Sequence, residues 1–414
     1  MLKIVKATLA LGVLLSTVIN SVQASDLPPI RLGFLTIKSG ALAAGGAQME
    51  EGLKLFLKQH NNMIAGRKVQ LFVADTAGQP AVTKSKTQEL VEKDHVQVII
   101  GPLAAFEALA IDEYIKKMQT PIISPSAAAE DLTQRKPNPW FVRAVGSSAQ
   151  PSHPFGEYAA KTLKYKRIAI IADDFAFGHE IASGFQRAFE DNGGRIVQKI
   201  WTPLNVADYG MYISQIKPNV DAVFAAFAGG NGIKFVKQYN DYGLKGKIPL
   251  LTSMTTVDEG VLPSIGNDAL GIISTGWYAS GIENIINKAF VQEFRQDYKR
   301  DPGFYSVGAY GAALMLQAAL KKVNGDIENK KAFMAALRSA VVDDDPRGKI
   351  TLDSYGNPIM NIYIRKVERV DRRLTNVVIK TYPEVSQFWT YDPKAFLANP
   401  VYSRDYPPAR HLEN

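Results

Sequence analysis

The sequence of 414 residues contains no cysteine. This absence excludes disulfides, thiolate metal sites, a cysteine nucleophile and lipid attachment to cysteine. Histidine is scarce as well, and its positions lie too far apart for a histidine-based metal motif: His60, His95, His153, His179 and His411. We therefore expect neither a metal site nor another cofactor.

The excess of positive charge is small. Lysine and arginine number 48 against 40 acidic residues, giving +8, or +6 once Lys3 and Lys6 are removed with the segment described next. So mild an excess does not indicate nucleic-acid binding. After residue 24 no run of about 18 apolar residues occurs, so we expect no membrane anchor. The length exceeds the roughly 250–300 residues that one core serves, which favours two domains.

Residues 1–24 have the pattern of a signal peptide. Lys3 and Lys6 precede an apolar stretch over residues 7–19, and Val22 and Ala24 place small residues at the −3 and −1 positions of a cleavage site. The stretch is too short to cross a bilayer. A lipoprotein would need a cysteine after the cleavage site, so we expect cleavage after Ala24 and a free protein in the periplasm.

Short apolar runs alternate with amphipathic helical patterns along the chain. The predicted strands cover residues 30–37, 69–74, 96–100, 121–124, 167–172, 195–201, 222–227 and 248–251. Strands separated by helices of this length indicate right-handed βαβ units and parallel sheets. Because the series breaks near residues 147–152 and then restarts, we expect two similar α/β lobes. Residues 349–380 instead predict antiparallel strands, and an irregular aromatic tail follows them.

Seven segments carry a resemblance to a known family. They are IRLGFLTIKSG (30–40), VIIGPL (98–103), IISPSAAAED (122–131), RIAIIADDFAFG (167–178), NGGR (192–195), DAVFAAFAG (221–229) and RGKITLDSYGNP (347–358). Over residues 30–377 the chain resembles the type I periplasmic solute-binding proteins of ABC transporters of the branched-chain-amino-acid type. Within that family, the resemblance extends to the branch that binds aromatic acids.

The resemblance implies two Rossmann-like lobes joined by a three-strand hinge, which close on a ligand like a flytrap. It implies no enzyme activity, a membrane permease as partner, and a monomer. The hinges would lie near residues 144–147, 275–278 and 345–350. The first lobe would comprise residues 25–145 and 277–347, and the second residues 146–276 and 348–380, with a C-terminal extension, 381–414, packed on both.

Small residues follow several predicted strands, where parallel α/β sheets bind their ligands. The resemblance places six of these residues in an amide cradle for a ligand carboxylate: Leu103, Ala104, Ala105, Ser126, Ala127 and Ala128. It places others around the rest of the ligand, namely Leu42, Phe177, Phe227, Ala228, Met254 and Tyr305. Taken alone, these strand ends are more typical of ordinary βα turns than of a binding site.

The expected ligand follows from a departure from the family pattern. Amino-acid binders hold the ammonium with a glutamate after the strand at residues 249–251, where this sequence has Met254, and with a tyrosine where it has Phe177. A buried ammonium without a carboxylate partner costs several kcal/mol. We therefore expect a carboxylic acid without an amino group, aromatic or phenylpropanoid. A branched-chain or other amino acid is the alternative, with Asp258 or Glu259 supplying the missing charge.

Two other classes of function remain open at this level. A periplasmic hydrolase would use Asp173 or Ser126, but neither has a histidine or cysteine near it in the sequence. A sensor subunit built on the same fold would bind a ligand without transporting it.

Overall fold

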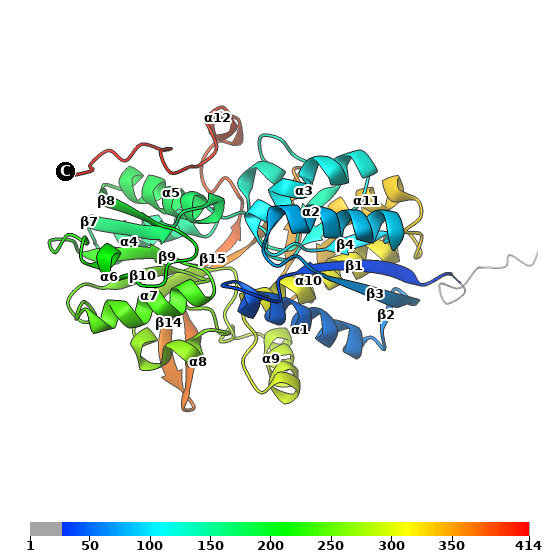
Figure 1. Cartoon of the computed structure of the whole chain (residues 1–414), viewed down its shortest axis with the longest axis horizontal. Coiled ribbons are helices and arrows are strands. Elements are labelled where there is room, and N and C mark those ends of the chain that lie inside the picture. The colour runs from blue at the N-terminus through cyan, green and yellow to red at the C-terminus, as the bar shows by residue number, and fades with distance from the viewer. Residues whose placement is uncertain (1–26, 414) are drawn as a thin grey trace, which may run out of the picture.

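The computed structural model describes residues 27–413 as two α/β lobes that lie side by side (Figure 1). Residues 1–26, which contain the predicted signal peptide, and residue 414 lie outside the described residues. Each lobe has one sheet with helices packed against both of its faces. The predicted fold class of two α/β lobes is confirmed.

The first lobe is built on a six-stranded sheet in the order β2-β3-β1-β4-β5-β6. All neighbours pair in parallel except β2 with β3. Central strands such as β1 read as continuous apolar runs because helices cover both of their faces. The strands are β1 (Ile30–Thr36), β2 (Met63–Ile64), β3 (Arg67–Asp75), β4 (Val98–Ile100), β5 (Ile122–Ser124) and β6 (Phe141–Arg143).

Helices from two distant parts of the chain cover this first sheet. The N-terminal part contributes α1 (Ala43–Gln59), α2 (Pro80–Gln88) with a π-helical turn η2 (Glu89–Lys93), α3 (Ala105–Met118) and a 3₁₀ turn η3 (Glu130–Thr133). A later part contributes α9 (Ile285–Tyr298), α10 (Phe304–Lys322) and α11 (Lys330–Arg338). Asparagine side chains cap two of these helices, since Asn284 accepts from the N–H of Asn287 and Asn329 from that of Ala332.

The second lobe contains a nine-stranded mixed sheet. Its parallel part has the order β11-β10-β9-β7-β8, and antiparallel strands extend it beyond β11. The parallel strands are β7 (Arg167–Asp173), β8 (Arg195–Thr202), β9 (Ala222–Ala226), β10 (Leu250–Ser253) and β11 (Ile273–Gly276). The antiparallel strands are β12 (Val341–Val342), β13 (Ile350–Leu352), β14 (Pro358–Val370) and β15 (Arg373–Val385).

Side chains from alternate positions of these strands enter two separate cores. Ile168, Ile170 and Phe224 face one core, whereas Ala169 and Ile171 face the other. Five helices and a 3₁₀ turn cover the two faces: α4 (Ser152–Lys161), α5 (Ala176–Asp191), α6 (Gly210–Ile213), α7 (Gly230–Asp241), α8 (Leu262–Ile265) and η4 (Gly266–Ala269). The period of two along each strand thus gives a sheet that is apolar on both faces.

The chain passes between the lobes three times. It leaves the first lobe after β6, returns after β11 and crosses again between α11 and β14. These crossings bring the carboxyl ends of β1, β4 and β5 opposite those of β7, β9 and β10. The ligand site described below lies between these two sets of strand ends.

The C-terminal tail contacts both lobes. β15 runs to Val385, past residue 381 where the extension was expected to begin, and the tail then forms α12 (Pro393–Leu397). Rings of the tail form a small apolar core with Ala149 of the second lobe. From the first lobe, Arg135 donates to the carbonyl oxygens of Phe396, Asn399 and Pro400.

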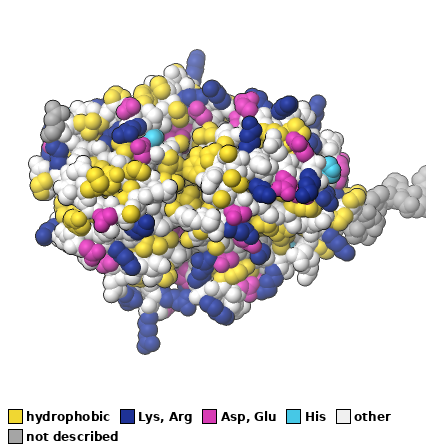
Figure 2. Space-filling view, in the orientation of Figure 1, with side chains coloured by type: hydrophobic (Ala, Val, Ile, Leu, Met, Phe, Trp, Pro, Cys, Tyr) yellow, Lys and Arg dark blue, Asp and Glu magenta, His cyan; other side chains and the backbone are white. Residues whose placement is uncertain are grey.

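The surface of the molecule agrees with the mild net charge. On the face shown in Figure 2, lysine and arginine side chains are interspersed with aspartate and glutamate, and hydrophobic side chains gather where the lobes meet. Among residues 27–413, no helix is both long enough and apolar enough to cross a bilayer.

Candidate functional site

A pocket lies between the carboxyl ends of the two sheets. It contains about 330 Å³ of space outside protein atoms, part of it open to solvent. The residues that the first lobe contributes, here called the first wall, are Leu42, Leu103, Ala104, Ala105, Ser126 and Ala128. The second lobe contributes the second wall, made of Phe175, Phe177, Ala228 and Thr255. Phe304 and Tyr305, at the start of α10, close the site between them.

The first wall presents backbone N–H groups at the start of α3. Ala104 precedes the helix, and its N–H donates to the carboxyl oxygen Oε2 of Glu107 at 2.8 Å. Within the described part of the chain, the N–H groups of Ala105 and Phe106 have no hydrogen-bond partner, as is usual in a first helical turn. The helix dipole adds partial positive charge at this end. This wall therefore favours an anion.

A hydroxyl lies beside these N–H groups. Ser126 follows β5 and is 7% exposed, and its hydroxyl makes no hydrogen bond to residues 27–413. The neighbouring serine differs, because Ser124 donates its hydroxyl to the carbonyl oxygen of Ala127 at 3.0 Å. Ser126 is thus free to donate to a bound acid, while Ser124 maintains the turn.

The second wall is made mainly of aromatic rings. Phe175 and Phe177 follow β7, and their rings stack with centroids 5.8 Å apart. Phe175 also meets Phe106 of the first lobe edge-on at 5.8 Å, so the two lobes touch at the margin of the pocket. Thr255 gives its hydroxyl to the carbonyl oxygen of Phe227 at 2.7 Å. The rings supply a flat apolar surface for a ligand body.

Charged side chains are absent from the pocket lining, although carboxylates lie behind it. Asp173 accepts from the N–H of Ala228 at 3.0 Å and from the side chain of Asn231 at 2.9 Å. Burial raises the pKa of Asp173 to about 7. Its two hydrogen bonds hold the loop that follows β9 in place, so Asp173 shapes the second wall from behind.

The two acidic residues considered for an ammonium partner also bind protein groups. Asp258 accepts from the side chain of Gln48 at 3.0 Å and from the N–H of Phe304 at 2.6 Å. Glu259 accepts from the N–H of Ser280, and its other oxygen lies 3.8 Å from the guanidinium of Arg365. Neither lines the pocket.

The structure brings nine of the twelve predicted site residues to this pocket. The nine are Leu42, Leu103, Ala104, Ala105, Ser126, Ala128, Phe177, Ala228 and Tyr305. Three lie elsewhere. The carbonyl oxygen of Ala127 accepts hydrogen bonds from Ser124 and Arg143 within the loop that follows β5. Phe227 packs against Phe235 and Tyr209 in the core of the second lobe. Met254 packs against Gly276.

The correction at Met254 changes the argument about charge. Thr255, one residue later, faces the pocket instead. A threonine supplies no negative charge either, so the absence of an acidic side chain from this position stands.

Three lining residues were not predicted: Phe175, Thr255 and Phe304. Phe175 precedes α5 and Phe177 lies in its first turn, so Phe175 could have been found from its neighbour at the same strand end. Phe304 could have been found from its neighbour Tyr305 at the start of α10. Among residues 27–413 no group of three acidic or histidine side chains is arranged to hold a metal ion.

Comparison with known proteins decides the family. The model of the family described as periplasmic binding protein matches residues 29–372. The chain belongs to this family. A relative from Brucella melitensis named Leu/Ile/Val-binding protein homolog 6 is 29% identical over 349 residues, covering 83% of this chain and 88% of the relative.

Two solved structures share both sequence and fold with the chain. An ABC transporter substrate-binding protein from Sphaerobacter thermophilus is 32% identical with a TM-score of 0.81, covering 87% of this chain and 99% of the other. A solute-binding protein of an ABC transporter from Rhodopseudomonas palustris BisB5, solved with 3,4-dihydroxybenzoic acid, is 31% identical with a TM-score of 0.83, covering 87% and 98%. This periplasmic binding protein is therefore a substrate-binding subunit of an ABC transporter, a class that delivers small ligands to membrane permeases.

Proposed function

We propose that this chain captures a small carboxylate without an amino group, of the aromatic or phenylpropanoid class, and delivers it to the permease. The observation that carries the proposal is the asymmetry of the pocket. The first wall offers unpartnered N–H groups and a hydroxyl, and the second offers rings without a charged group. An acid would place its carboxylate on the first wall and its ring against Phe177.

The solved relatives support this ligand class. One was solved with 3,4-dihydroxybenzoic acid, and a second R. palustris protein, 27% identical with a TM-score of 0.82, was solved with benzoate. The competing class, branched-chain amino acids, is favoured by the name of the Brucella relative. An amino acid would bury its ammonium beside Thr255 and Phe177, while Asp258 and Glu259 are already bonded elsewhere.

Calorimetry with a matched pair of ligands tests the proposal. Phenylalanine and 3-phenylpropanoate differ only in the α-amino group, so their comparison isolates the cost of burying an ammonium. We expect 3-phenylpropanoate, benzoate or 4-hydroxybenzoate to bind at least roughly a hundredfold more tightly than phenylalanine or leucine, which corresponds to about 2.7 kcal/mol. Micromolar binding of leucine would contradict the proposal, and so would the absence of binding by every acid.

We also propose that the lobes close over the ligand about the three crossing segments, with the lobe boundaries given above. Small-angle scattering of the unmodified chain should show a smaller radius of gyration with saturating acid than without it.

We also propose that the chain is exported and cleaved after Ala24. N-terminal sequencing of the secreted protein should then give Ser25 as the first residue. An intact Met1 on the secreted form would contradict cleavage after Ala24.

A further inference from the structure

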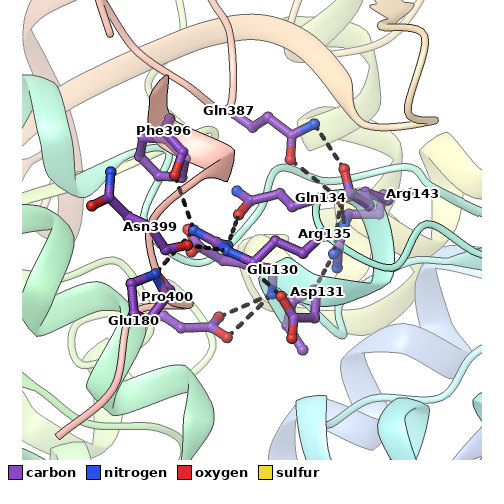
Figure 3. Close-up of polar contacts among 12 residues, drawn as sticks. Glu130, Asp131, Gln134, Arg135, Arg143, Glu180, Gln387, Phe396, Asn399 and Pro400 are labelled. Atoms are coloured by element: carbon purple, nitrogen blue, oxygen red, sulfur yellow. Dashed lines mark hydrogen bonds and ion pairs between the residues drawn. The ribbon is translucent and has the colours of Figure 1, made fainter. Parts of the chain in front are cut away.

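Two buried glutamates meet where the lobes touch (Figure 3). Glu130 begins η3 of the first lobe, and Glu180 lies on α5 of the second. Their side chains are 0% and 3% exposed. The backbone N–H of Glu130 donates to both carboxyl oxygens of Glu180, at 3.2 and 3.3 Å. The contact therefore joins the lobes and holds two carboxyl groups close together.

The pair adjoins the ligand pocket from both walls. Glu130 follows Ala128 of the first wall by two residues. Glu180 follows Phe177 of the second wall by three residues, about one turn of α5. Because Glu130 and Glu180 belong to different lobes, a separation of the lobes that moves α5 away from η3 would expose both to water. Their burial would then depend on the closed arrangement.

Within residues 27–413 neither glutamate forms an ion pair, and the charges of Arg143 and Arg135 offset the effect of burial on the pKa only in part. Arg143 donates to the carbonyl oxygens of Ala127 and Ala129 and to Thr133, whereas Arg135 donates to the tail. The other ionisable groups around the pair are Asp131 beside Glu130, Arg187 on α5, and Tyr402 of the tail, which bonds to Arg187 and His153. Both carboxyl oxygens of Glu130 lack a hydrogen-bond partner within residues 27–413.

An ionised carboxylate is costly in such a place. Burial raises the pKa of Glu180 to about 8. Burial, followed by the nearby charge of Glu180, raises the pKa of Glu130 above its ordinary value. At neutral pH the closed arrangement consequently holds protons that two separated, hydrated glutamates, with a pKa of about 4.3, would release.

We propose that Glu130 and Glu180 form a proton-dependent latch that keeps the lobes closed over the ligand when the pair is protonated and weakens closure as the pair ionises. The latch rests on the proposed function, because it regulates capture at the same pocket. The sign follows from linkage: the closed form binds more protons than the open form, so rising pH favours opening. The effect begins above the pKa of the open form, and the part contributed by Glu180 levels off above about pH 8.

Ligand affinity as a function of pH, compared between variants, tests the latch. For 4-hydroxybenzoate binding to the full chain, we expect the Kd to rise roughly tenfold or more between pH 6 and pH 8. Glu180→Gln or Glu130→Gln should flatten this profile, whereas the exposed Glu113→Gln on α3 should leave it unchanged. Asp173 also titrates near neutral pH, so the difference between wild type and the glutamine variants is the diagnostic quantity. Equal profiles in all four proteins would overturn the latch.

A second measurement needs no ligand and separates failure of the latch from failure of the proposed function. Because the chain has no cysteine, Lys117→Cys and Lys237→Cys place one spin label on each lobe at exposed positions. We expect the distance between labels to lengthen from pH 6 to pH 9 in the otherwise unmodified chain and to stay short in Glu180→Gln. If no acid binds at any pH, the proposed function fails. If the distances are identical at both pH values in both proteins, the latch fails as well.

Discussion

The two walls of the pocket achieve recognition by different means. The first wall relies on backbone N–H groups at the start of α3, next to side chains as small as Ala104 and Ala105. The second wall relies on the rings of Phe175 and Phe177. Backbone donors are oriented by the fold and require only that side chains stay small, whereas rings recognise by their own shape. Under the proposed function, selectivity for the carboxylate belongs to the first lobe and selectivity for the ligand body to the second.

The largest expected effect comes from comparing Phe177, a ring of the second wall, with Phe227, a ring of the core behind that wall. Phe227→Ala should lower the free energy of unfolding by about 3–5 kcal/mol, because it opens a cavity beside Phe235 and Tyr209. Urea denaturation would measure this loss. Phe177→Ala should instead weaken binding of 4-hydroxybenzoate by about 1–2 kcal/mol and change stability less. The reverse pattern would place Phe227 in the pocket after all.

The next largest effect is the loss of affinity expected when one backbone donor is removed from the first wall. Ala105 is the first residue of α3, where proline fits the helix, so Ala105→Pro deletes an N–H while preserving the fold. If that N–H binds a ligand carboxylate, calorimetry should show a loss of about 1.5–3 kcal/mol.

A matched proline variant provides the control for Ala105→Pro. Ile285 is the first residue of α9, is 84% exposed and does not line the pocket, so Ile285→Pro should leave affinity unchanged. Equal affinities of the two proline variants would show that the Ala105 N–H does not contact the ligand.

The smallest expected effect on affinity comes from removing one hydroxyl from each wall in turn. Ser126→Ala removes a hydroxyl that makes no hydrogen bond within the described residues and should weaken acid binding by about 1 kcal/mol, measured as Kd. Thr255→Val removes a hydroxyl already bonded to the carbonyl oxygen of Phe227, so it should lower stability without a comparable change in Kd. A larger effect on Kd from Thr255→Val would move carboxylate recognition to the second lobe.

The sequence predicted most of the fold because its strands are buried on both faces. Apolar runs such as residues 30–37 and 167–172 correspond to β1 and β7 within a residue at their ends. The strands β6 and β11 were not predicted as strands, since their sequences, FVR and ISTG, are not continuous apolar runs and β11 falls at an expected hinge. The antiparallel strands were predicted at 361–367 and 374–380, but hairpin pairing extends β14 and β15 well beyond the apolar residues.

The sequence predicted the first wall better than the second. Most of the small residues predicted after β4 and β5 line the pocket, because backbone at a strand end lies beside it whichever way a small side chain points. After β7, β9 and β10, the direction of a large side chain depends on a single loop residue. Phe227 and Met254 therefore turned into the core, while Phe175 and Thr255 turned into the pocket.

The sequence by itself determined the alternation of strands and helices, the absence of thiol chemistry, and the small, uncharged character of the residues at the strand ends. These properties are local, because they depend on residue type and spacing along the chain. The tertiary structure decided which rings line the pocket, left Asp258 and Glu259 bonded elsewhere, and brought Glu130 against Glu180 from opposite lobes. Such contacts join residues 46 positions or more apart, and only tertiary packing fixes them.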